Sequence, residues 1–138
     1  MFLLDTNVVS ELRKIGDGKA DNRVTGWASA HNVGVFYLSA VTILELELGI
    51  LLLERKDANQ GARLRSWFER QVLPEFASRI LPVDTAVALR CARLHVPDPR
   101  SERDALIAAT ALVHGFTIVT RNRRDFEPTD VPILNPWQ

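Results

Sequence analysis

The chain has 138 residues, of which 46% are hydrophobic and 25% charged, and we expect one soluble globular domain over residues 1–138. Its 17 basic and 17 acidic residues cancel, which excludes a protein whose whole surface is basic, so binding to an anionic polymer needs a local basic patch. The N-terminus has no basic segment before its short apolar run, and acidic residues interrupt the longest apolar stretches. We therefore expect neither a signal peptide nor a membrane span, and a cytoplasmic location.

Short apolar runs alternate along the chain with longer segments of helical spacing. In chain order we expect a strand at 2–5, a helix at 8–14, a loop at 15–22, a short helix at 24–30, a strand at 33–39, a helix at 41–56, a break at 57–61, a helix at 62–77, a strand at 79–84, a helix at 85–96, a loop at 97–101, a helix at 102–115, a strand at 116–120, a loop or helical turn at 121–126 and a last strand at 131–135. Strands that alternate with helices imply crossover connections, so we expect an α/β fold with a mostly parallel sheet covered on both sides.

Four acidic residues lie just past an expected strand or near the start of the following helix, where open parallel sheets bind their ligands. They are Asp5, Glu45, Asp84 and Asp104. Helix capping explains each of them taken singly. Thr42 and Ser101 each precede one of these acids by three residues, which is the spacing of a capping box. Asp84 directly precedes an expected helix, and Asp5 could cap the helix that starts near Val8.

A metal site explains the acids taken together. Carboxylates gathered at one end of a sheet repel each other, and in a cleft of low dielectric constant this repulsion costs roughly several kcal/mol. A divalent cation bound between them removes that cost. Ligation by oxygen alone suits Mg²⁺ or Mn²⁺, and such an ion can activate water for attack on a phosphodiester. Glu45 supports this interpretation because it lies among Leu and Ile residues, with open space expected above Gly49.

Other chemistries have less support in the sequence. No two of the three histidines, His31, His95 and His114, have the spacing of metal ligands. The single cysteine, Cys91, excludes an internal disulfide, and its apolar helical neighbours predict a buried, unreactive thiol. "DTN" resembles the start of the haloacid-dehalogenase phosphatase motif, but Asn7 replaces the second Asp of that motif and leaves no general acid.

Three segments of the chain resemble PIN-domain ribonucleases. They are "MFLLDTNVVSEL" at the N-terminus, "YLSAVTILELELGILLL" in the middle and "RDALIAATALVHGFTIVTRNRRDF" near the end. Within this family the chain is similar to the VapC toxins of bacterial type II toxin–antitoxin pairs, and the ending "VPILNPWQ" fits their FitB-like branch. The resemblance covers essentially all 138 residues in the right order and implies a three-layer α/β/α fold.

Carried over by position, the resemblance implies an acidic metal-binding set. Its members are Asp5, Glu45 and Asp104, with Thr6 and Asn7 supporting the first acid and with Ser39 and Thr120 lining the site. Asn122 stands at a fourth catalytic position, where the family often has Asp, and its amide adds no charge. Asp125 either compensates from the following turn or forms a surface pair with neighbouring arginines. Asp84 matches no catalytic position, so we expect it to cap a helix.

Two basic segments are candidates for contact with RNA. Arg121, Arg123 and Arg124 follow the strand that ends beside the proposed site, and they either hold phosphates of a single strand or form a solvated turn. Farther back, Arg63, Arg65 and Arg70 lie on a helical segment with Trp67 and Phe68. These two aromatic residues fit an RNA contact, the core or a dimer interface.

The resemblance implies a Mg²⁺-dependent endoribonuclease, with Mn²⁺ as a substitute, that forms a homodimer. It also implies a cognate antitoxin whose C-terminal segment lies across the active site. A catalytically silent PIN-like binding module is the alternative that Asn122 favours and the three intact acids oppose. A metal-dependent phosphatase is a further alternative, which Asn7 opposes.

Overall fold

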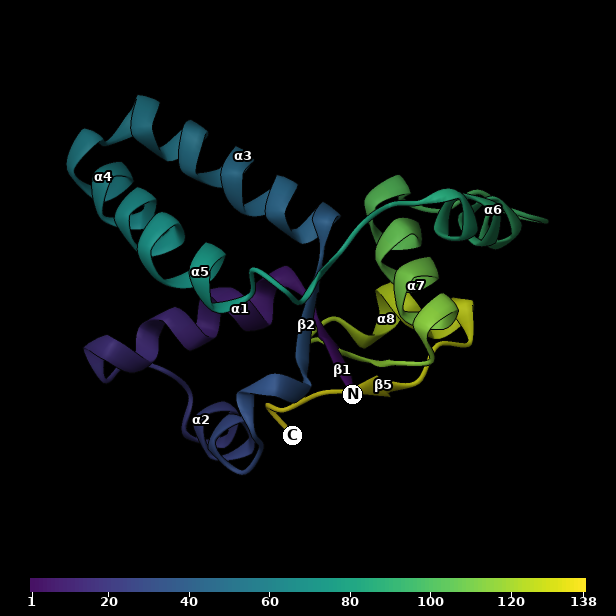
Figure 1. The fold of residues 1–138 in the computed structure, drawn as a ribbon, viewed down its shortest axis with the longest axis horizontal. Helices are drawn as coiled ribbons and strands as arrows, with labels where there is room; N and C mark the ends of the chain where they lie inside the picture. The colour runs from purple at the N-terminus through teal and green to yellow at the C-terminus, as the bar shows by residue number, and fades with distance from the viewer.

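The computed structural model describes residues 1–138 and contains a five-stranded sheet between two layers of helices (Figure 1). All neighbouring strands are parallel, and their order across the sheet is β3-β2-β1-β4-β5. The strands are β1 (Phe2–Leu4), β2 (Phe36–Ser39), β3 (Ile80–Leu81), β4 (Thr117–Val119) and β5 (Ile133–Leu134). The expected three-layer α/β/α architecture is confirmed.

Alternation along the strands divides the core between the two faces of the sheet. Leu4 of β1 packs in a cluster with Leu38 of β2 and Val119 of β4. Leu3, one residue earlier in β1, packs in a second cluster with Ile118 of β4. Leu3, Leu4 and both β4 residues are fully buried, as expected for central parallel strands covered on both faces.

The helices of the first half of the chain lie on one side of the sheet (Figure 1). They are α1 (Thr6–Arg13), the 3₁₀ turn η1 (Lys14–Asp17), α2 (Asn22–Ser29), the 3₁₀ turn η2 (Val33–Val35), α3 (Ala40–Lys56), α4 (Ala58–Trp67), the π-helical turn η3 (Phe68–Val72) and α5 (Leu73–Glu75). None of the helices in the chain is both long enough and apolar enough to cross a bilayer.

The later helices cover the opposite side (Figure 1). They are α6 (Thr85–Leu94), α7 (Glu102–His114), α8 (Arg123–Phe126) and the 3₁₀ turn η4 (Glu127–Thr129). Small side chains of α7, among them Ala108 and Ala111, are fully buried with Ile118 of the sheet, while α6 packs on α7 through Val87 and Cys91. Gly115 ends α7 at a φ of 70°, a conformation that glycine adopts without strain.

The expected break at 57–61 is confirmed only at Asp57, because α3 ends at Lys56 and α4 already begins at Ala58. Asp57 accepts a hydrogen bond from the backbone N–H of Gln60 and caps α4. Gly61 lies inside α4, against α3, and a Cβ atom there would stand only 2.6 Å from Cα of Glu54. This glycine therefore permits close packing of the α3–α4 hairpin and does not mark a loop.

The expected strand at 33–39 is too long at its start. Asn32 accepts a hydrogen bond from the N–H of Gly34 at 2.8 Å, which favours a 3₁₀ turn at 33–35 over extended backbone. At the other end, Ser39 accepts a hydrogen bond from the N–H of Val41 and caps α3, so the helix starts before Thr42. A capping box from Thr42 to Glu45 is therefore wrong.

Candidate metal centre

The carboxyl ends of the three central strands bring polar residues to one edge of the sheet. Asp5 directly follows β1, Ser39 ends β2 and Thr120 directly follows β4. Because β1 lies between β2 and β4, these three positions are neighbours across the sheet. The helices α1 and α3 begin there, so their first turns also lie beside this edge.

Asp5 is 7% exposed and is held by three hydrogen-bond donors. Oδ1 accepts from the N–H of Thr6 at 2.8 Å. Oδ2 accepts from Oγ1 of Thr120 at 2.8 Å and from Nδ2 of Asn7 at 3.3 Å. Burial raises the pKa of Asp5 above its ordinary value, although the hydrogen bonds from Thr120 and Thr6 oppose the rise. Asp5 thus caps α1, as the simpler interpretation expected, but it also receives side-chain donors that a cap does not require.

Thr120 and Asn7 fix the direction of these hydrogen bonds. Oγ1 of Thr120 accepts from the N–H of Asn122 at 3.0 Å and from Nδ2 of Asn7 at 3.3 Å. Its single proton therefore points to Asp5. The amide oxygen of Asn7 accepts from the N–H of Arg121 at 3.2 Å and ties α1 to the segment after β4. Thr120 and Asn7 thus hold the carboxylate of Asp5 in one orientation.

Glu45 lies on the second turn of α3, and its side chain returns toward the first turn of α1. Oε1 accepts a hydrogen bond from the hydroxyl of Thr6 at 2.7 Å. Thr6 therefore links the two acids, since its N–H donates to Asp5 and its hydroxyl to Glu45. Arg103 of α7 approaches Oε2 of Glu45 with Nη1 at 3.7 Å. The sequence interpretation missed Arg103, whose only signal is its position next to Asp104.

Asp104 lies on the first turn of α7, where Ser101 occupies the N-cap position without a side-chain capping hydrogen bond. The proposed capping box at this helix is therefore wrong. Burial raises the pKa of Asp104 to about 6, with further contributions from the negative charges of Asp125, Asp5 and Glu45. Asp104 and Asp5 therefore both have pKa values raised first by burial and then by the negative charges of neighbouring acids.

Asp125 of α8 is the fourth acid of this cluster. Its charge contributes more than that of Asp5 or Glu45 to the raised pKa of Asp104. Asn122 is exposed, and its part in the network is the backbone N–H that donates to Thr120. Arg123 pairs with Glu127 at 3.6 Å, and Asp125 has no cation within 4.0 Å, so the expected surface pair of Asp125 with the neighbouring arginines is absent.

The remaining predicted positions have structural partners. Ser39 is fully buried and caps α3, without a hydrogen bond to any of the acids. Asp84 accepts from the N–H of Val87 at 3.0 Å and caps α6, as the sequence predicted. The hydroxyl of Thr42 is buried without a hydrogen-bond partner. Thr42 precedes Glu45 by three residues and therefore shares its face of α3.

The arginines after β4 border a hollow of about 540 Å³ next to the acids. Arg121, Arg123, Arg124 and Asp125 line it together with Asn122, Asn135 and Gln138, and none of the lining residues is hydrophobic. The guanidinium group of Arg121 stacks over the ring of Trp137, 5.2 Å from its centroid. These arginines place positive charge beside Asp125.

A second group of metal-ligating side chains lies between α6 and α7. Sγ of Cys91 is 3.8 Å from Nε2 of His95, which is 3.7 Å from Oε2 of Glu102. Nδ1 of His95 accepts from the N–H of Arg100 at 3.1 Å, so the neutral ring carries its proton on Nε2, the atom that faces the other two groups. This tautomer opposes a metal. Burial also raises the pKa of the Cys91 thiol, as expected for an unreactive cysteine.

The chemistry of the acidic cluster fits a hard divalent cation. Its ligand atoms are carboxylate oxygens, with hydroxyl and amide groups behind them and neither histidine nor cysteine within the set. Mg²⁺ and Mn²⁺ favour such oxygen donors, whereas zinc sites usually include nitrogen or sulfur. Burial and the neighbouring acids raise the pKa values of Asp5 and Asp104, so a positive charge between these two residues would stabilise both carboxylates.

The family model, the sequence relatives and the solved structures that resemble this chain all point to one protein family. The chain matches the PIN domain model over residues 2–131. It is 40% identical over 144 residues to Toxin FitB of Neisseria gonorrhoeae, with 99% of each chain covered. It is 36% identical over 143 residues to VapC ribonuclease Y4jK of Sinorhizobium fredii, with 100% of this chain and 99% of the relative covered. The crystal structure of FitAcB from Neisseria gonorrhoeae superposes with a TM-score of 0.89 at 37% identity, covering 100% of this chain and 99% of that one.

Proposed function

Because this chain belongs to the PIN-domain family, we propose that it is a Mg²⁺-dependent endoribonuclease and the toxin of a type II toxin–antitoxin pair. The observation that carries this proposal is the cluster of four carboxylates at the carboxyl edge of a parallel sheet, with three arginines on its rim. The full-length similarity to proteins named as a toxin and as a ribonuclease supports both parts of it.

In this proposal Asp5, Glu45 and Asp104 hold the cation, and Mn²⁺ can replace Mg²⁺. When bound, the ion would supply Lewis-acid activation of water and stabilise negative charge on the phosphodiester during in-line displacement. Asp125 adds negative charge at the outer side of the same cluster, where Asn122 provides none. Charge from Asp125 thus takes the place of the acid that the family often has at position 122.

The residues around the acids keep them in position. Three donors hold both oxygens of Asp5, so its carboxylate has little freedom to rotate. Thr6 orients Glu45 from the same turn. Asp104 has one opposing hydrogen bond, from Ser101, which lowers its pKa less than burial and the neighbouring acids raise it. A cation bound there would favour the charged form of Asp104.

The arginines after β4 are proposed to hold the RNA backbone. Arg121, Arg123 and Arg124 line the hollow beside Asp125, at the place where a phosphate next to the scissile bond would lie. Arg121 stacks on Trp137, which restricts its motion and keeps its charge at the rim. Phosphate contacts of this kind position the strand and are independent of sequence.

We also propose a homodimer and a cognate antitoxin. Four leucines of α3 that share one helix face are between 41% and 59% exposed: Leu44, Leu48, Leu51 and Leu52. A second copy of the chain would bury this stripe of exposed leucines. The antitoxin follows from the type II toxin assignment, and an open reading frame for a small protein directly upstream would support it.

Expression in a bacterial host tests the toxin assignment. We expect induction of the wild-type chain to stop growth and to produce cleaved RNA, and we expect Asp5→Asn to do neither. Asp84→Asn is the matched control because it makes the same change at a helix cap outside the cluster, and it should remain toxic. Equal toxicity of the wild type and Asp5→Asn would contradict metal-dependent cleavage and would favour a non-catalytic binding module.

A further inference from the structure

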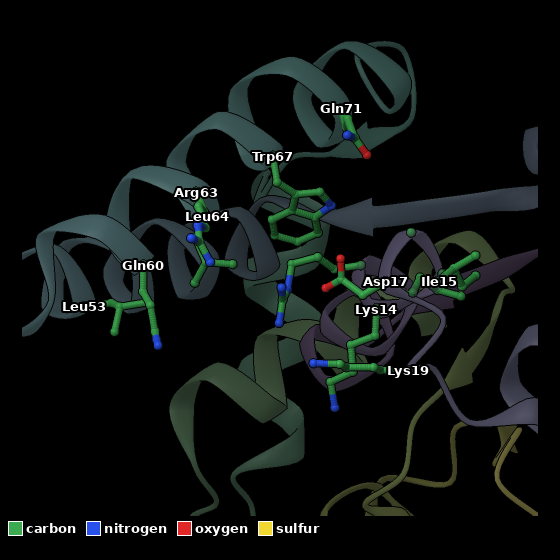
Figure 2. A pocket seen from close by; sticks show the side chains of 13 residues that line it. Lys14, Ile15, Asp17, Lys19, Leu53, Gln60, Arg63, Leu64, Trp67 and Gln71 are labelled. Atoms are coloured by element: carbon green, nitrogen blue, oxygen red, sulfur yellow. The ribbon is translucent and has the colours of Figure 1, made fainter.

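We propose that a basic groove between α1–η1 and the α3–α4 hairpin holds the flanking part of the single-stranded RNA substrate, away from the acids. This inference rests on the proposed function and extends it to a substrate-binding site. The groove has a volume of about 840 Å³ and is lined from one side by α4 and from the other by α1 and η1 (Figure 2). It is separate from the hollow beside Asp125, with which it shares no residue.

The groove concentrates positive charge in a chain that is neutral as a whole. Its basic residues are Arg13, Lys14, Lys19 and Arg63, and Asp17 is its only acid. Lys14 pairs with Glu11 at 3.1 Å, whereas the other three cations have no carboxylate within 4.0 Å. Unpaired cations around a hollow attract a polyanion, and release of its counterions drives binding.

The neighbouring Arg65 shows the contrast with an ordinary ion-paired surface. It forms hydrogen bonds with Glu47 and with Glu54 on the other side of the α3–α4 hairpin. Its charge is therefore used to join the two helices. Arg63, two residues earlier on α4, is exposed and lines the groove without such a partner. The candidate RNA contacts on this helix thus divide into a structural arginine and a free one.

Trp67 supplies a surface on which bases can stack. Figure 2 shows its indole ring directed from α4 into the groove, with Gln71 and Arg63 on either side. The ring is half-buried, whereas its neighbour Phe68 is fully inside the core. An aromatic face next to free cations and glutamine amides suits a nucleotide strand, which offers both bases and phosphates. The phosphates of such a strand would face the cations while a base covers the indole.

The position of the groove relative to the acids is set by α1. Thr6, which contacts both Asp5 and Glu45, begins this helix, and Arg13 ends it. Seven residues of α-helix span about 10 Å, at about 1.5 Å per residue. A strand that places one phosphodiester at the acids can therefore reach the groove within a few nucleotides. The groove is thus placed to affect binding of long substrates without touching the reacting atoms.

Fluorescence anisotropy of a labelled 15-nucleotide oligouridylate, with chelator present to prevent cleavage, tests this groove. We compare the wild type with the double variant Lys19→Gln/Arg63→Gln, and with Arg90→Gln as the matched control on the exposed side of α6. Removal of each cation that binds a phosphate should lower the association constant about tenfold at about 50 mM salt and reduce the slope of log K against log salt by about 0.7. The control should bind as the wild type does, and the effect should grow with oligonucleotide length.

The outcomes separate this inference from the proposed function. Binding that is equal in the wild type and the double variant, or absent in both, overturns the groove, even if the wild type cleaves RNA with Mg²⁺. Loss of binding in the double variant supports the groove, even if no RNA is cleaved. A labelled oligoglutamate peptide is the second probe. If the double variant loses the peptide and keeps the RNA, the groove binds protein and the inference is wrong.

Discussion

Asp104→Asn should stabilise the protein when no divalent cation is present. The substitution keeps the shape of the side chain and removes a charge that burial and three neighbouring acids disfavour. In most proteins an Asp near a helix N-terminus contributes favourably, so its loss lowers stability. An increase in stability on Asp104→Asn would therefore indicate a carboxylate that is positioned to bind a ligand and does not stabilise the fold.

The size of the effect follows from the pKa of Asp104. The difference between about 6 and the ordinary value of 3.8 corresponds to about 3 kcal/mol at about 1.36 kcal/mol for each pH unit. Solvent reaches part of this carboxylate, and screening reduces our expectation to about 1–2 kcal/mol. Because the folded-state pKa is raised, the wild type loses this stability as the pH rises from about 4 to about 6, and the loss is complete above that range.

Urea unfolding in chelator measures the difference at about pH 7.5 and again near pH 4. We expect Asp104→Asn to be the more stable protein at the higher pH and equal to the wild type at the lower one. Asp98→Asn, in an exposed loop, is the control and should change little at either pH. Destabilisation by Asp104→Asn at the higher pH, or a difference that is independent of pH, would refute electrostatic strain in the cluster.

Three further predictions concern the cluster, the dimer and the core. Asp125→Asn should lower the pKa of Asp104, measured by NMR titration, and weaken Mg²⁺ binding in calorimetry; unchanged affinity would remove Asp125 from the site. Leu48→Glu should convert a dimer into a monomer in light scattering, and a dimer that persists would place the interface elsewhere. Gly61→Ala should lower the free energy of unfolding by about 1–3 kcal/mol because its Cβ would meet the backbone of α3, whereas Gly26→Ala has open space and should not.

The sequence was sufficient to predict the part of the site that depends on strand ends. Asp5 follows a buried strand, and a parallel sheet brings the ends of neighbouring strands to one edge, whereas its partner Thr120 was expected only from the resemblance to PIN domains. Glu45 and Asp104 were identified for the same reason, since both lie near the start of a helix that leaves this edge or packs beside it. The same pattern also selected Asp84, which caps α6, and only the resemblance to PIN domains removed it from the set.

The rest of the site depends on contacts between segments that local patterns do not relate. Arg103 approaches Glu45 because α7 lies beside α3, and the charge of Asp125 reaches Asp104 because the short helix α8 turns back toward the cluster. The groove likewise has Lys19 and Arg63 in its lining, although these residues come from two segments that lie far apart in the sequence. The expected boundary between two helices was placed at Gly61 because glycine is common in turns, but here glycine permits close packing of two helices.

Cleavage of RNA by the purified protein is the most direct test of a metal-dependent ribonuclease. Single-stranded and structured RNA would be incubated with Mg²⁺, Mn²⁺ or chelator, beside Asp5→Asn and the cap control Asp84→Asn. We expect cleavage by the wild type and Asp84→Asn with either metal, and none in chelator or with Asp5→Asn. Cleavage that persists in chelator, or in Asp5→Asn at the wild-type rate, would contradict a role for the carboxylate cluster in holding the metal.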